Sequence, residues 1–338
     1  MFSEKYMKII DEIEDGKTCN EICLSLGISR KQLYYYMQSL KNEGINFSRK
    51  YYSNGVIKYS LDNRIINKDE DNSIDLITRS NSENERFIVF SDSHFGNENE
   101  KKELHDKLFE YATKNDIHVL LCCGDILDGT YTKGIKKRSR EEVIDQIVHF
   151  LDIFPFDKNI TVIGVLGDHD YSILSIYGIN IKNLFDNKRH DLVFGGFNNT
   201  NINIKNDNIV LYHHLNGGNI TPKASPIILK GHPHNYSSTR REDGTVDICV
   251  PSTSGIMDIL PSSLIMDLTF KHGYISEADF KQLLFLDKDY IVSTNRYEFK
   301  KKMQDKYSPV KNEEHFYHER DLDELLEYNK NKTLSIKK

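Results

Sequence analysis

The chain has 338 residues, of which 38% are hydrophobic and 28% are charged, and its formal net charge is −6. This composition is typical of a soluble globular protein, and no apolar run reaches the roughly 20 residues that a membrane-spanning helix needs. The first residues lack the continuous apolar stretch of a secretory signal, so we expect a cytoplasmic protein with no membrane partner. Five cysteines, an odd number without secretory features, argue against a disulfide framework.

Residues 1–62 predict a small domain of helices followed by a hairpin. Apolar residues recur at helical spacing, and two capping-box pairs each begin a further helix. A Ser-Asn-Gly turn separates two short stretches with strand chemistry. In chain order the expected elements are helices over 4–13, 18–26 and 29–44 and strands over 47–52 and 56–61.

This order of elements resembles the winged helix-turn-helix modules of DNA-binding proteins. Between Ile28 and Lys58 there are six basic residues and one acidic residue. In such modules the start of the last helix enters the major groove and the hairpin meets phosphate. The residues expected to contact DNA are Arg30, Lys31, Gln32, Tyr35, Lys50 and Lys58. The alternative is that the module binds a protein and that its lysine-rich face is only solvated.

The rest of the chain divides by composition. Residues 63–85 are dominated by Asp, Glu, Asn and Ser, which predicts a flexible acidic linker. From residue 86 to 270, short apolar strands alternate with helices, as in an α/β layered domain. Residues 271–338 form a less regular extension, for which we expect one strand near 289–294 and a charged helix over 321–328. The extension is expected either to cover the edge of the sheet or to accept a protein partner or a second copy of the chain.

Aspartate and histidine residues follow five apolar strands of the α/β region. In chain order these motifs are Asp92-Ser93-His94, Gly124-Asp125, Gly167-Asp168-His169-Asp170, His213-His214 and Gly231-His232-Pro233-His234. Open α/β sheets place their sites at the carboxyl ends of strands. Carboxylates and imidazoles are also suitable ligands for divalent metals. One such motif is a weak signal, whereas the ordered set of five is specific.

The ordered set resembles the calcineurin-like metallophosphoesterases over residues 86–270. The resemblance implies a layered α/β (α+β) β-sandwich flanked by helices, and a phosphoric ester hydrolase with two divalent metal ions. Manganese is the first choice, with iron, zinc, nickel or magnesium as alternatives. The implied ligands are Asp92, His94 and His234 for one ion, Asp168, His213 and His232 for the other, and Asp125 for both.

The resemblance also implies catalytic roles. In this family a hydroxide that bridges the metals acts as nucleophile, and His169 would donate a proton to the leaving oxygen. His94 is counted among the catalytic residues as well as among the metal ligands. We expect Asp170 to orient His169, and Asp128 to support the ligands without binding metal. His213 is favoured over His214 because the family ligand is the first histidine after its strand, but the sequence leaves both open.

Asp168 departs from the family pattern, which normally has asparagine at this position. An asparagine binds metal through its carbonyl oxygen and can donate its amide to phosphate, whereas an aspartate can only accept. The extra negative charge predicts that metal is held more firmly and anionic substrate less firmly. Whether the aspartate lowers activity stays open.

The substrate is expected to be nucleic acid, with DNA favoured. Lys136, Lys137, Arg138 and Arg140 follow the second motif and could line the entrance, where they would collect a phosphate backbone. Together with the winged helix they favour a nuclease, as in the repair-nuclease branch of the family. The alternatives are a small-molecule phosphatase or cyclic-nucleotide phosphodiesterase, and a DNA-binding regulator with a weakened metal site. The sequence does not distinguish exonuclease from endonuclease action.

Overall fold

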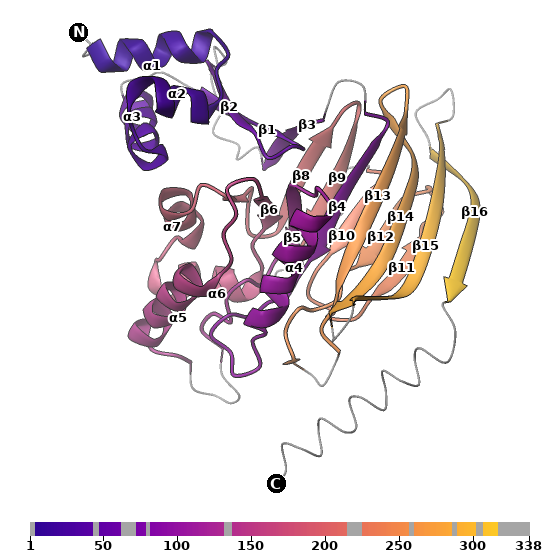
Figure 1. The fold of residues 1–338 in the computed structure, drawn as a ribbon. Coiled ribbons are helices and arrows are strands. Elements are labelled where there is room, and N and C mark those ends of the chain that lie inside the picture. Colours follow the sequence, from indigo (N-terminus) through magenta and orange to yellow (C-terminus); the bar gives the residue numbers. More distant parts are fainter. Residues whose placement is uncertain are drawn as a thin grey trace.

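The protein contains two mixed β-sheets with helices, shown in Figure 1. This computed structural model describes residues 4–42, 47–61, 72–78, 82–131, 137–214, 225–256, 260–285, 289–301 and 307–316. The helices are α1 (Glu4–Glu14), α2 (Cys19–Leu26), α3 (Arg30–Asn42), α4 (Lys102–Lys114), α5 (Arg140–Ile153), α6 (Asp168–Tyr177) and α7 (Ile181–Lys188). None of these helices is long and apolar enough to cross a bilayer.

Each sheet has eight strands. Sheet A has the order β11 (Ser237–Arg240), β12 (Val246–Cys249), β10 (Ile227–Lys230), β9 (Asp207–Tyr212), β8 (Asn199–Ile204), β3 (Ser73–Ile77), β1 (Phe47–Tyr52) and β2 (Ile57–Leu61). Sheet B has the order β16 (Tyr307–Phe316), β15 (Asp289–Lys301), β14 (Tyr274–Phe285), β13 (Ser263–Lys271), β4 (Asn84–Phe90), β5 (Val119–Cys123), β6 (Thr161–Val165) and β7 (Leu192–Phe194).

Alternation along the strands of sheet B builds two hydrophobic cores. Phe87 and Val89 of β4 pack in the core that sheet B shares with sheet A. Ile88 and Phe90 point the other way, into a core covered by α4, α5, α6 and α7. Because successive side chains of a strand face opposite sides, a strand covered on both faces is continuously apolar. Full burial of one such side chain contributes about 1.5–3 kcal/mol.

Parallel pairing brings the predicted ligand motifs to one end of the molecule. Strands β4, β5 and β6 are parallel neighbours in sheet B, and β9 and β10 are parallel neighbours in sheet A. The five motifs follow the carboxyl ends of these five strands. The fold thereby explains why residues about 140 positions apart in the chain can share hydrogen bonds, as Asp92 and His232 do.

The N-terminal module, residues 4–61, contains the elements that the sequence predicts. Helices α1, α2 and α3 are followed by the antiparallel hairpin of β1 and β2. Thr18 and Glu21 form the expected capping box of α2, and Ser29 exchanges hydrogen bonds with Gln32 at the start of α3. These side chains satisfy backbone N–H groups that have no partner inside the helix.

The expected flexible linker is wrong for its middle part. Residues 73–77 form β3, which pairs in parallel with β8 on one side and with β1 on the other. Ile74 and Leu76 are buried between polar neighbours, and this alternation over five residues is too short to stand out in an acidic segment. Residues 62–71 and 79–81 lie outside the described part of the chain. The hairpin of the N-terminal module is therefore continuous with sheet A.

The turn of the hairpin packs against the α/β region. The Ser53 N–H donates to the Ile77 carbonyl at 2.8 Å. Gly55 has φ of +76°, and a Cβ atom there would lie 2.3 Å from the carbonyl oxygen of Asn159. The turn between the two strands of the hairpin therefore contacts the protein itself.

The C-terminal extension contributes strands to sheet B. Beyond residue 270, β14, β15 and β16 extend the sheet by antiparallel pairing. The strand expected near 289–294 is the start of β15, whereas the sequence did not predict β14 or β16. The helix expected over 321–328 lies outside the described residues. All five cysteines are free thiols.

We predict that Gly55→Ala lowers the free energy of unfolding by at least about 1 kcal/mol more than Gly16→Ala does, because the new methyl group would overpack a backbone oxygen. Gly16 is the matched control, since its φ is +72° and no atom lies within 4 Å of its added Cβ. Both variants carry a similar strain of the left-handed backbone. Urea denaturation measures the difference, and equal losses would show that the hairpin turn is not packed as described.

Candidate metal centre

The motif loops turn sharply as they leave the strands. Asp92, His94, Asp125, His232 and His234 all have positive φ, between 46° and 83°. Residues other than glycine rarely adopt this region, and such strain concentrates at functional sites. Gly124 precedes Asp125 at φ of +101°, and a Cβ atom there would lie 2.3 Å from the His213 ring. The backbone conformation of these loops thus directs the Asp and His side chains toward the same region of the protein.

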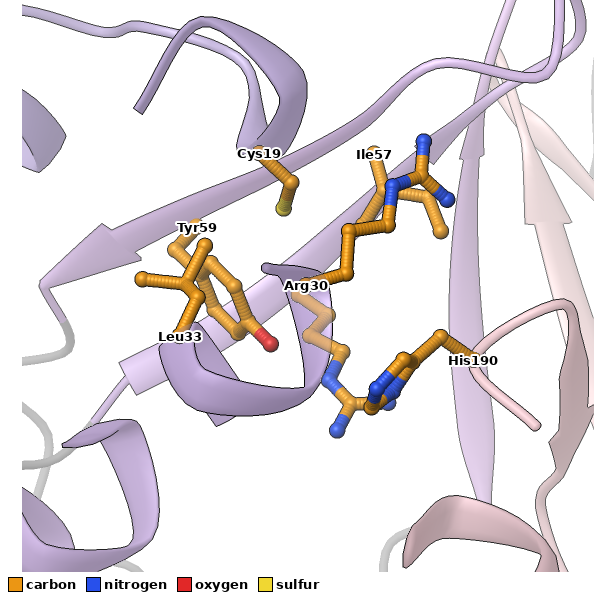
Figure 2. A pocket seen from close by; sticks show the side chains of 7 residues that line it. Cys19, Arg30, Leu33, Ile57, Tyr59 and His190 are labelled. Carbon is orange, nitrogen blue, oxygen red and sulfur yellow. The ribbon is translucent and has the colours of Figure 1, made fainter. Parts of the chain in front are cut away.

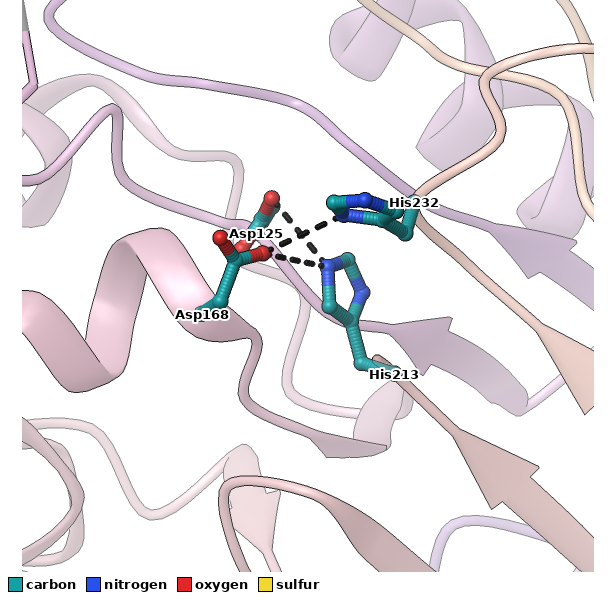
Figure 3. Close-up of side chains that lie close together, drawn as sticks. All are labelled: Asp125, Asp168, His213 and His232. Atoms are coloured by element: carbon teal, nitrogen blue, oxygen red, sulfur yellow. Dashed lines mark hydrogen bonds and ion pairs between the residues drawn. The ribbon is translucent and has the colours of Figure 1, made fainter. Parts of the chain in front are cut away.

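One cluster contains Asp125, Asp168, His213 and His232, as Figure 3 shows. His213 Nε2 lies 3.2 Å from both Asp125 Oδ2 and Asp168 Oδ1. His232 Nδ1 lies 3.3 Å from Asp168 Oδ1. The other nitrogen of His213, Nδ1, is 2.7 Å from the Cys123 carbonyl oxygen. Because a carbonyl only accepts, Nδ1 carries a proton and Nε2 faces the carboxylates.

A second cluster contains Asp92, His94 and His234. His234 Nε2 lies 3.4 Å from Asp92 Oδ1. His94 Nε2 is buried without a hydrogen-bond partner and lies 4.0 Å from Asp92 Oδ1 and 3.9 Å from Asp125 Oδ2. A buried imidazole nitrogen that faces two carboxylates but bonds to neither fits a site in which a cation lies between them. The two clusters meet at Asp125.

The structure distinguishes the two neighbouring histidines after β9. His213 is buried within the first cluster, whereas His214 Nδ1 lies 3.4 Å from the Tyr212 hydroxyl. The geometry favours His213 over His214 as a ligand.

Asp128 contacts two histidines, and with His94 and His169 it forms a third group whose ligand atoms lie close enough to share a metal ion. Its Oδ1 atom is 3.3 Å from His94 Nδ1 and 3.7 Å from His169 Nδ1. Its backbone carbonyl accepts a hydrogen bond from His169 Nδ1 at 2.8 Å, and Asn97 donates to its other carboxylate oxygen at 3.0 Å. The role of Asn97 was not predicted, because nothing in its spacing from His94 distinguishes it. The backbone carbonyl and the carboxylate of Asp128 thus both hold the His169 ring in its orientation.

The family model described as calcineurin-like phosphoesterase matches residues 85–332. The chain belongs to the calcineurin-like phosphoesterase family. Its matched region includes every Asp and His residue of the clusters. No curated protein sequence matches the chain.

Solved structures resemble this phosphoesterase at low sequence identity. Vps29 of Chaetomium thermophilum is 13% identical with a TM-score of 0.33, and the match covers 69% of this chain and 96% of that one. GAP50, the anchor in the inner membrane complex of Plasmodium, is 12% identical with a TM-score of 0.38, covering 66% and 91%. The Pseudomonas putida nuclease MPE is 13% identical with a TM-score of 0.28, covering 65% and 96%.

The expected role of Asp170 needs correction. Its carboxylate accepts hydrogen bonds from the backbone N–H groups of Ile126, Leu127 and Gly167, at 3.0 to 3.1 Å. It therefore joins the loops after β5 and β6 and does not orient the His169 ring, which Asp128 holds. Burial and the neighbouring Asp125 carboxylate raise the pKa of Asp170 to about 7.

The expected role of Arg138 is also corrected. Its guanidinium turns inward, where it pairs with the Asp128 carboxylate and donates to the carbonyl oxygens of Gly129 and Tyr131. A half-buried guanidinium is more stable with a carboxylate than in solvent at the entrance. Lys137 and Arg140 are exposed and remain candidates for phosphate contact, while Lys136 lies outside the described residues.

The expected DNA-contacting residues separate into two groups. Lys31 and Tyr35 are exposed on α3, and Lys50 is half-buried. The others have intramolecular partners: Arg30 donates to Asn20 at 2.9 Å, Gln32 caps α3 with Ser29, and Lys58 donates to the Gly16 carbonyl at 2.7 Å. Tyr34 of α3 is buried, with its ring 5.4 Å from His190 of the phosphoesterase region. Part of the helix expected to read DNA thus packs on its own protein.

Carboxylates control the protonation of the histidines in the clusters. Burial alone would lower the pKa of His94 and His213, but the surrounding aspartates outweigh it and raise both. The hydrogen bond with Asp168 raises the pKa of His232. Burial lowers the pKa of His234. Burial alone would raise the pKa of Asp125 and Asp168, but the neighbouring histidines outweigh it and lower both.

We predict that binding of Mn²⁺ releases protons and tightens as pH rises from about 6.5, the ordinary imidazole pKa. A ligand histidine must be neutral, and the raised pKa values of His94, His213 and His232 keep these rings protonated to higher pH when metal is absent. Titration calorimetry in two buffers with different ionisation enthalpies measures the released protons.

The adjacent histidines provide a matched pair for this experiment. His213→Gln is expected to weaken Mn²⁺ binding and to reduce proton release, whereas His214→Gln is expected to change neither. An affinity independent of pH, or identical behaviour of the two variants, would contradict the assignment.

Proposed function

We propose that this phosphoesterase uses two divalent ions, with Mn²⁺ as first choice, to hydrolyse phosphodiester bonds of nucleic acid. The observation that carries the metal assignment is the pair of clusters, which lie side by side because Asp125 Oδ2 of the first is 3.9 Å from His94 Nε2 of the second. In this assignment Asp92, His94 and His234 hold one ion, and Asp168, His213 and His232 hold the other. Asp125 contributes to both.

The two ions would supply Lewis acidity, a lowered pKa of bound water and compensation of the charge on phosphate. His169 would act as proton donor to the leaving oxygen. Its Nδ1 donates to the Asp128 carbonyl, so Nε2 is the atom available to the substrate. The Asp128 carboxylate lies 3.7 Å from Nδ1 and helps to hold this orientation of the ring.

Exposed groups near the site and on α3 support nucleic acid as the substrate class. Lys137 and Arg140 flank Arg138, whose guanidinium reaches Asp128 beside the clusters. Lys31 and Tyr35 are exposed together on α3, with the Lys31 ammonium 6.0 Å from the Tyr35 ring centre. Cations contact phosphates, and an aromatic ring can stack on a base. The winged-helix assignment of the N-terminal module belongs to this proposal.

Asp168 adds a specific feature to the proposed centre. Its Oδ1 atom lies within 3.3 Å of nitrogens of both His213 and His232. Ionised aspartate compensates the cationic charge of the second cluster more fully than asparagine would. We therefore propose a centre with firm metal retention and weaker attraction for the phosphate anion.

We predict that His169→Asn lowers kcat about 10²- to 10⁴-fold, the usual contribution of general acid catalysis, without changing metal content. The loss should be smaller for bis-para-nitrophenyl phosphate than for DNA, because para-nitrophenolate leaves without a proton. Steady-state rates on both substrates, with metal analysis, test this.

The control for this variant is His149→Asn. His149 is exposed on α5, where it pairs with Glu100 at 2.7 Å, and its loss is expected to leave both rates unchanged. An equal loss of His169→Asn on both substrates would contradict proton donation. If the wild type hydrolyses neither substrate with any divalent metal tested, the proposed phosphoesterase activity is wrong.

We predict that the double variant Lys31→Gln, Tyr35→Ala raises KM for DNA about tenfold and makes its salt dependence less steep, since a phosphate contact and a stacking surface are lost. Its kinetics on bis-para-nitrophenyl phosphate should not change. Lys158→Gln, which removes one exposed charge elsewhere, is the control. Unchanged KM for DNA would favour a small-molecule substrate.

A further inference from the structure

The Arg138 side chain closes a short loop beside the proposed proton donor. It pairs with the Asp128 carboxylate and donates to the backbone carbonyls of Gly129 and Tyr131. Its backbone N–H donates to the Thr130 carbonyl at 3.0 Å. Only 18% of the side chain is exposed. Because a guanidinium carries five N–H donors in a rigid plane, it can hold several acceptors at once. One arginine thus contacts each residue from 128 to 131.

The same loop contacts the His169 ring at its edge and at its face. The Asp128 carbonyl accepts a hydrogen bond from His169 Nδ1 at 2.8 Å, and the Asp128 carboxylate lies 3.7 Å from that nitrogen. The Tyr131 ring packs against the imidazole, with 4.5 Å between the two ring centres. The loop that Arg138 closes therefore determines where the His169 ring lies and leaves Nε2 to face the substrate.

Further hydrogen bonds join this loop to α6, the helix that carries His169. Tyr177, the last residue of α6, donates its hydroxyl to the Arg138 carbonyl. The Ser172 hydroxyl accepts a hydrogen bond from the Thr130 N–H at 3.0 Å and donates to the His169 carbonyl at 2.6 Å. Loop and helix therefore hold the backbone on both sides of the imidazole, and the guanidinium adds the contact to the loop carboxylate.

We propose that Arg138 is a positioning residue for the proton donor His169. It acts by fixing the loop that contains Asp128 and Tyr131, and it does not contact the substrate. This inference rests on the proposed function of the site. Without the guanidinium, one carboxylate and two carbonyls of the loop lose a charged donor. Proton transfer requires the donor to lie about 2.6–3.2 Å from the leaving oxygen, so a loosened loop lowers the rate of that step.

The experiment compares two substrates that differ only in the leaving group, methyl phenyl phosphate and methyl para-nitrophenyl phosphate, at saturating Mn²⁺. Phenolate leaves poorly without a proton, because the pKa of a phenol is about 10, whereas para-nitrophenolate leaves without one. Arg138→Gln is expected to lower kcat on the phenyl ester about 10- to 100-fold. Its effect on the nitrophenyl ester should be much smaller, and KM for both esters should not change.

A double variant tests whether the arginine acts through His169. In the His169→Asn background, Arg138→Gln is expected to cause no further loss of kcat on the phenyl ester, because no proton donor is left to position. A direct contact between Arg138 and the substrate phosphate would instead raise KM, and its effect would persist in that background. That result would overturn the proposal.

Arg189→Gln is the matched control. Arg189 also pairs with one carboxylate, that of Asp191 at 2.7 Å, and donates to two backbone carbonyls in the segment after α5. Its side chain is 12% exposed. It precedes β7, which is parallel to β6, so it lies at the end of sheet B opposite to the ligand loops. The adjacent His190 points toward residues of the N-terminal module (Figure 2). Arg189→Gln is expected to lower the thermal midpoint about as much as Arg138→Gln, without changing the ratio of the two rates.

Arg138→Lys keeps the charge but not the planar set of donors, so it is expected to recover part of the lost rate, and it replaces Arg138→Gln in these comparisons if that variant does not fold. The proposal is overturned if Arg138→Gln lowers both rates equally, or if it changes their ratio no more than Arg189→Gln does. A wild type that hydrolyses neither ester with any divalent metal tested overturns the proposed function together with this inference. An active wild type whose two arginine variants behave alike overturns this inference alone.

Discussion

The convergence of buried carboxylates at one edge of the two sheets is the constraint on which the rest of the site depends. Asp92 and Asp125 are fully buried and Asp168 nearly so, and such charges require compensation. Histidines, backbone N–H groups and the proposed cations supply it. The His232 N–H bonds to Asp92, and the His169 N–H bonds to Asp125. Each loop therefore stabilises the acid of another loop, and the centre forms only when both sheets are assembled.

A further layer of hydrogen bonds and ion pairs holds the loops around the proposed metal centre. Asp170 receives three backbone N–H groups from the loops after β5 and β6. Asp128 holds His94 and His169 and is itself held by Asn97 and Arg138. Paired and hydrogen-bonded carboxylates of this kind fix rotamers, and fixed rotamers preserve catalytic geometry. The hydrolytic chemistry thus depends on residues from several loops that no short motif joins.

The N-terminal module is joined to the phosphoesterase region through sheet A. Its hairpin extends sheet A through β3, and its turn rests on Asn159. Tyr34 and Arg30 direct one side of α3 toward His190, which leaves Lys31 and Tyr35 on the exposed side.

The sequence by itself determined the family, the five strand-terminal motifs and the helices of the N-terminal module, because strand and helix periodicity and capping boxes are local. It could not place β3, since two apolar residues in an acidic segment gain their stability only from the strands beside them. The sequence also could not show that Asp128, and not Asp170, holds His169. Nor could it show that the Arg138 side chain turns inward to pair with Asp128. Those choices depend on distances between loops, which the tertiary structure alone decides because burial and charge pairing act across the whole fold.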